Sequence, residues 1–156
     1  NRKGTQVTRH DKPPVFPDLL PDLANHLAGE KIGQFNVRGI YKTFAPPAIY
    51  FGTIPDEAGY AIAINHYDTV TNLGRDTSTP AIKVQFRARG DKHPHSPARI
   101  LDRIYQELHD RDHFELDNST TVLRCICHLR GPEEQDTQGR WTRADSYTLT
   151  LNPQGE

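Results

Sequence analysis

The sequence predicts a single α+β domain, in which a mixed or antiparallel sheet of four to five strands carries two helices packed on one face. Two observations favour this fold class. Short runs of alternating apolar and polar residues recur along the chain, and two separate segments have apolar residues at helical spacing. A chain of 156 residues has the length of one domain and buries roughly 70% of the surface that its unfolded form exposes.

The chain divides into an N-terminal arm, a domain and a short tail. Residues 1–14 are polar and cationic, contain Pro13 and Pro14, and offer almost no apolar side chain to a core. They form either a frayed terminus or an arm that docks on a neighbouring chain. The domain is predicted over residues 15–152, and residues 153–156 form a C-terminal tail.

The first half of the domain is predicted to hold one helix and two strands. A helix over residues 16–29 has an apolar stripe and a stop at Gly29. Its stripe consists of Leu19, Leu20, Leu23, Ala24 and Leu27. The segment 30–47 shows no clear period and is either a strand or a loop. Strands follow at 49–54 and 60–67, and the second is apolar enough to be buried on both faces. Residues 68–80 are predicted to form a polar loop.

The second half begins with the most regular strand, 82–89, whose even positions are apolar and whose odd positions are polar. A second helix opens with Ser96 as its N-cap and Pro97 at its first position. Its buried stripe is Ile100, Leu101, Ile104, Tyr105 and Leu108.

Two closing strands are predicted from alternation. In the first, Leu123, Cys125, Cys127 and Leu129 share the core face, opposite Arg124, Ile126, His128 and Arg130. In the last, Tyr147, Leu149 and Leu151 face the core. Residues 131–145 between them are predicted to be a long polar hairpin loop.

A candidate DNA-facing surface comes from the polar positions of two strands. The net charge of −1 gives no overall attraction to nucleic acid. A local basic patch would nevertheless form if the strands lie side by side. Its residues are Lys83, Arg87, Arg89, Arg124 and Arg130. The alternative is a sheet surface that faces solvent or a protein partner.

Two clusters could suggest metal chemistry. His109 and His113 stand four residues apart with aspartates between them, but they fall at a helix end, and Arg111 between them would repel a cation. A solvated helix terminus is the favoured interpretation. Cys125 and Cys127 are interpreted as small core residues, since zinc would need two further ligands on their face.

No motif for nucleotide binding or nucleophilic catalysis occurs, so the sequence predicts a protein that is not an enzyme and has no cofactor. No apolar run reaches the roughly 18 residues that span a bilayer, so no membrane is expected among its partners.

Several fragments resemble a family of small tailed-phage proteins, the tail terminators or minor capsid (tail completion) proteins. The resemblance lies in residues 49–57 (IYFGTIPDE), 82–87 (IKVQFR), 104–108 (IYQEL), Gly131-Pro132 and the strand 147–151, and it covers residues 17–152. It is a pattern of elements, not a catalytic signature.

The resemblance implies a structural virion protein at the head–tail junction, assembled in the host cytoplasm. Such a protein forms a homo-oligomeric ring, commonly a hexamer, that caps the tail tube. Its expected partners are the tail tube protein, the head completion or connector proteins, and nonspecific DNA in the lumen. Two alternatives stay open: a head-to-tail connector or stopper subunit, and a small metal-dependent enzyme that uses the cluster His109–His113.

Overall fold

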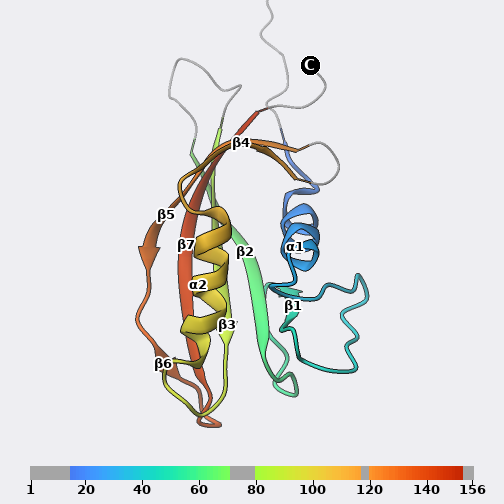
Figure 1. The fold of residues 1–156 in the computed structure, drawn as a ribbon, viewed down its shortest axis with the longest axis vertical. Coiled ribbons are helices and arrows are strands. Elements are labelled where there is room, and N and C mark those ends of the chain that lie inside the picture. Colours follow the sequence, from blue (N-terminus) through green and yellow to red (C-terminus); the bar gives the residue numbers. More distant parts are fainter. Residues whose placement is uncertain (1–14, 71–79, 117–119, 153–156) are drawn as a thin grey trace, which may run out of the picture.

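A computed structural model describes residues 15–70, 80–116 and 120–152 of the chain (Figure 1). The predicted arm 1–14, the tail 153–156 and most of the predicted loop 68–80 lie outside the described residues. The two helices are α1 (Leu19–Gly29) and α2 (Ser96–Leu108). The strands are β1 (Ala48–Phe51), β2 (Ala61–Val70), β3 (Ala81–Arg89), β4 (Arg111–Glu115), β5 (Thr121–Arg130), β6 (Glu134–Gln135) and β7 (Trp141–Asn152).

The strands form one mixed sheet, which confirms the predicted α+β class. Its order is β1-β2-β3-β7-β5-β4, with β6 paired to β7, and only the β1–β2 pair is parallel. The sheet has seven strands, more than the four to five predicted. The strands that sequence analysis missed are β4, whose pattern shows a single buried residue, Phe114, and β6, which has two residues.

Both helices pack on the same face of the sheet, as predicted. A single apolar cluster joins Leu23 and Leu27 of α1 with Leu101 and Ile104 of α2 and the inward residues of the strands, such as Phe86. All five of these side chains are fully buried. Leu20, predicted in the α1 stripe, is partly buried against this cluster. Neither helix of the described chain is long and apolar enough to cross a bilayer.

The strand β4 closes the core by crossing over the ends of both helices (Figure 1). Its Phe114 contacts the His26 ring at 6.1 Å between centroids. His26 Nε2 lies 2.7 Å from Glu107 Oε2 and so links α1 to α2. Thr120 Oγ1 donates a 3.0 Å hydrogen bond to Oδ2 of the buried Asp22 in α1. The two helices and the crossing strand therefore form one packed body.

The predicted facing of β5 holds for Cys125 and Cys127 and is wrong for Leu129 and Arg130. The pairing of β5 with β7 shifts register between Val122 and Arg124 and again between Cys127 and Leu129. Each shift reverses which face the following residues occupy. Cys125 is consequently fully buried, whereas Leu129, expected beside it, is 58% exposed. Alternation alone could not place these bulges.

Residues 131–145 were expected to be a long polar loop, but most of them form two paired strands, β6 and the start of β7, joined by a short turn. β7 already begins at Trp141, and the turn before it is fixed by Asp136. Asp136 Oδ1 accepts backbone hydrogen bonds from Gln138 and Arg140, both at 2.9 Å. Gly139 takes the left-handed backbone that this turn requires, with φ of +82°. The segment 30–47 is a loop with one bridge between Gln34 and Ala48.

Candidate assembly surfaces

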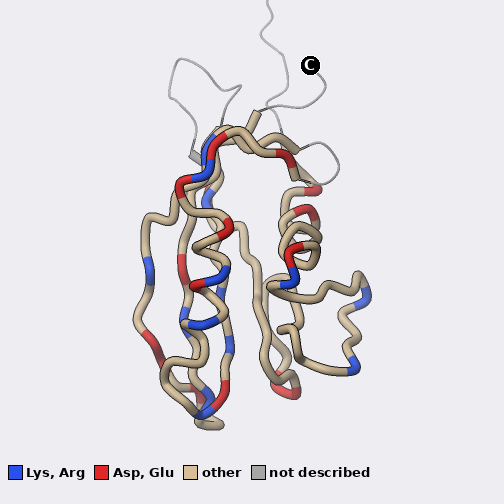
Figure 2. Tube along the Cα trace, viewed as in Figure 1, with Lys and Arg blue, Asp and Glu red and all other residues tan. Residues whose placement is uncertain are grey.

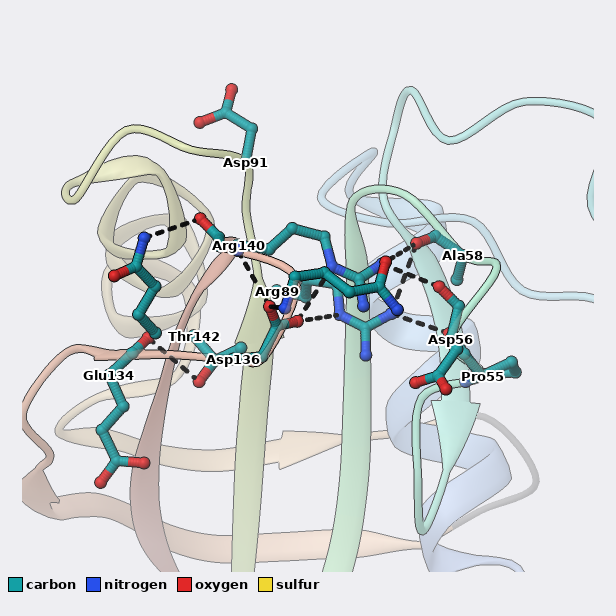
Figure 3. A network of polar contacts seen from close by, with 12 residues as sticks. Pro55, Asp56, Ala58, Arg89, Asp91, Glu134, Asp136, Arg140 and Thr142 are labelled. Atoms are coloured by element: carbon teal, nitrogen blue, oxygen red, sulfur yellow. Dashed lines mark hydrogen bonds and ion pairs between the residues drawn. The ribbon is translucent and has the colours of Figure 1, made fainter.

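Two loops meet at one end of the sheet, and two arginines hold them together (Figure 3). Arg140 Nη1 donates to the carbonyl oxygens of Asp56 at 2.8 Å and Ala58 at 3.1 Å, and its Nε donates to Asp136 Oδ2 at 2.9 Å. Arg89 Nη1 donates to the carbonyl oxygens of Pro55 at 2.7 Å and Ala58 at 3.3 Å. The turn after β1 is thereby fastened to β3 and to the β6–β7 hairpin.

The electrostatics of this network follow from its burial. Burial lowers the pKa of the Arg89 guanidinium, and the neighbouring charge of Arg140 lowers it further. Burial would raise the pKa of Asp136, but hydrogen bonds from Arg140 and Gln138 outweigh it and leave that pKa below its ordinary value. The Asp136 carboxylate thus stays ionised between the guanidinium groups of Arg89 and Arg140. The network thereby holds the turn 55–58 and the β6–β7 hairpin in a fixed position.

The turn 90–95 at the same end is ordered by Asp91 and Ser96. The Tyr60 hydroxyl donates to the Asp91 carboxylate, which holds the pKa of Asp91 far below its ordinary value. Ser96 Oγ accepts the Asp91 N–H at 2.8 Å and donates to the His93 carbonyl at 2.7 Å. The prediction that Ser96 is the N-cap of α2 is wrong. Ser96 is the first residue of the helix, and the N-cap is His95. A β-carbon at Gly90 would lie 2.0 Å from Ser96 Oγ, so only glycine fits there.

On the face of the sheet away from the helices, the central side chains are small or polar. Lys83 and Arg87 on β3 lie beside Thr148 and Ala144 of β7 on this face. Tyr67 and His128 also meet there, with the tyrosine hydroxyl 3.2 Å from His128 Nε2. Burial lowers the pKa of His128, and the charge of Lys83 lowers it further.

The structure does not bring the five residues of the candidate DNA-facing surface into one patch. Arg124 is on the helix-free face, where it bridges Asp110 at 2.7 Å and Asp112 at 2.8 Å. Arg89 is buried in the loop network. Lys83 and Arg87 keep the positions expected of them on the helix-free face of β3.

Arg130 is placed on the opposite face by the second register shift of β5. Its guanidinium bonds to Asp102 of α2 at 2.7 Å and to the buried Asp145 at 3.0 Å, and it lies 4.5 Å above the Tyr105 ring. Arg143 reaches the same Asp145 carboxylate at 3.1 Å. The role of Arg130 here is to tie β5 to α2. The alternation of residues in β5 does not predict this role, because it depends on the bulge.

The two clusters weighed as alternative metal sites do not form a ligand set. His109 follows α2, stacks on Tyr105 at 4.4 Å, and accepts the Cys127 N–H at its Nδ1 at 3.0 Å. Asp110 and Asp112 are paired with Arg124 instead. Within the part of the chain that the structure describes, no three His, Cys, Asp or Glu side chains are arranged to hold a metal ion.

The two cysteines are unbridged thiols. Cys125 is fully buried in the core and Cys127 is partly buried against it. Burial raises the pKa of Cys125 to about 12, and burial also raises the pKa of Cys127. Their packing agrees with the interpretation as small core residues, although a register shift places Leu129 on the other face.

These features define a mixed sheet with one helix-free face and a braced loop end, which is the turn 55–58 held by Arg89, Arg140 and Asp136. The comparison with protein families adds its identity. The family model described as bacteriophage tail terminator protein matches residues 26–153. The chain therefore belongs to the bacteriophage tail terminator family, whose members are structural components of the virion tail. No curated protein matches the chain.

Proposed function

We propose that this chain forms a closed ring, commonly a hexamer in this role, that caps the tail tube at the head–tail junction without catalysing a reaction. The observation that carries the proposal is the family match over residues 26–153. Its partners in this proposal are further copies of itself, the tail tube protein and the head completion proteins, with assembly in the host cytoplasm. Ring closure requires a contact between two different surfaces of successive subunits.

The braced loop end supports this proposal physically. A subunit that seats on the end of a preformed tube binds more tightly when its contact loops are ordered beforehand, because less conformational entropy is lost on binding. The network of Arg89, Arg140 and Asp136 keeps the turn 55–58 in one conformation before any contact is made.

A second part of the proposal is that Lys83 and Arg87 face the DNA passage of the ring. Both lie on the helix-free face, where β3 has β7 on one side and β2 on the other. Contacts of this kind use phosphate charge alone, so they are weak and salt-dependent.

The test is to add the purified chain to tail tubes that are still growing and to image the tubes by electron microscopy. The proposal expects a ring of additional density at one end of each tube and a narrow distribution of tube lengths. Tubes that keep growing, together with a chain that binds head particles instead, would point to a connector or stopper subunit.

A further inference from the structure

The segment between α1 and β1 projects from one edge of the sheet as a loop (Figure 1). It leaves the body near Gln34 and returns at Ala48, where the two residues form an isolated bridge. Two of the most exposed large apolar side chains of the described chain stand on it: Val37 is 87% exposed and Ile40 is 66% exposed. Exposed apolar side chains grouped on one segment mark an interaction surface.

The loop is held in one conformation by its own hydrogen bonds. Gln34 Nε2 donates to the carbonyl oxygens of Thr43 at 2.9 Å and Pro46 at 2.7 Å. The Tyr41 hydroxyl accepts the Asn36 N–H at 3.1 Å and donates to the Ile49 carbonyl. A partner that binds this tip therefore meets a surface that is already ordered, which favours binding.

The charge of the loop points to an acidic partner. Residues 31–55 contain Lys31, Arg38 and Lys42 and no aspartate or glutamate. Figure 2 shows only cationic positions on the projecting loop. A complementary surface needs exposed carboxylates beside an exposed apolar residue.

The opposite edge of the same sheet offers this combination. β4 pairs only with the first half of β5, so the outer edge of Ile126–Arg130 has no strand partner among the described residues, and on this edge the Cys127 N–H donates to the His109 side chain. Leu129 on this segment is 58% exposed. After Gly131 and Pro132, Glu134 is exposed, whereas Glu133 lies 3.7 Å from His95, and Figure 2 shows acidic positions just beyond the end of β5. Unpaired strand edges of this kind are readily bound by another chain.

We propose that the loop tip of one subunit, formed by Val37, Arg38, Ile40 and Lys42, docks on the β5–β6 edge of a second copy. The acceptor surface consists of Leu129 and Glu134. Because the two surfaces lie at opposite edges of one sheet, each subunit donates one loop and receives another, as a heterologous ring contact requires. This inference rests on the proposed ring and names the surfaces that close it.

Charge reversal tests the contact. Arg38→Glu with Lys42→Glu should weaken ring formation about tenfold, and Glu134→Lys should also weaken it, because each change places like charges together. The variant with all three changes restores opposite charges and should assemble to within about threefold of the unmodified chain. The control, Arg103→Glu on α2, reverses one exposed charge away from both surfaces and should assemble normally. Sedimentation and ring counts on tube ends measure assembly.

A cross-link separates this contact from the ring itself. With Cys127→Ala in the background, Val37→Cys and Leu129→Cys should form a disulfide between neighbouring subunits in assembled rings. Rings that form without the cross-link and tolerate all charge reversals would overturn the docking contact and leave the proposed function standing. An unmodified chain that forms no ring on tube ends would overturn both.

Discussion

Replacing Arg140 with alanine tests whether the loop end is braced from within. The change removes the ion pair to Asp136 and the hydrogen bonds to the carbonyl oxygens of Asp56 and Ala58. The Arg140 and Asp136 side chains are 16% and 24% exposed, so solvent weakens this pair only in part. Hydrogen bonds to a charged group contribute about 1.5–3 kcal/mol each, but Arg89 still donates to Ala58 after the change.

The expected loss in the free energy of unfolding is therefore about 2–3 kcal/mol, below the sum of the three contacts. Urea unfolding measures it, and the slope with urea should stay unchanged. Hydrogen exchange should rise selectively in residues 55–58, because their carbonyl anchors are lost. Arg38→Ala, at the exposed loop tip, is the control and should change stability by less than about 0.5 kcal/mol. A loss of that small size for Arg140→Ala, with unchanged exchange at 55–58, would refute the brace.

Three further predictions concern individual residues. Replacing Cys125 and Cys127 with alanine should lower the free energy of unfolding by about 1–2 kcal/mol and remove no metal; loss of a stoichiometric metal ion would contradict their packing role. The pKa of His128 in the folded state lies below its ordinary 6.5, so the unfolded chain binds more protons. The free energy of unfolding should therefore fall as the pH drops through 6.5 and level off below the folded-state pKa. His128→Gln should flatten this dependence in thermal unfolding, and an unchanged profile would argue against it. Lys83→Glu with Arg87→Glu should weaken duplex DNA binding and lower its salt dependence by about two ions, whereas an unchanged salt slope would remove both residues from a DNA contact.

Strong periodicity made the centre of the fold predictable. The apolar positions Val84 and Phe86 alternate without interruption and are fully buried in β3. The stripe of α2 is equally regular, with Leu101 and Ile104 fully buried. Elements of this kind show their buried face in the sequence because one side of each is packed along its whole length.

The features that sequence analysis missed depend on tertiary contacts. The bulges in β5 send Arg130 to the helix face, and nothing in the alternation of that strand indicates where an extra residue stands. Arg140 binds the Asp56 carbonyl across 84 residues of chain, and Arg89 binds Pro55 across 34. Hydrogen bonds from arginine to loop carbonyls leave no pattern in the sequence, because any residue supplies the carbonyl.

For a similar reason, the sequence pattern does not decide between a strand and a loop for the projecting segment 30–47. Its order comes from the side chains of Gln34 and Tyr41, which bond to backbone groups within the same segment. The segment is ordered by these hydrogen bonds and not by a regular strand or helix, so its sequence shows no periodic pattern of apolar residues.

The most direct test of the ring proposal is an electron cryomicroscopy reconstruction of the assembled particle at a resolution that traces this chain. The expected result is a closed ring of its copies at the head-proximal end of the tail tube, with the loop 33–47 of each subunit against the β5–β6 edge of the next. Finding the chain at any other place in the particle, or as isolated copies at the junction, would contradict the proposal.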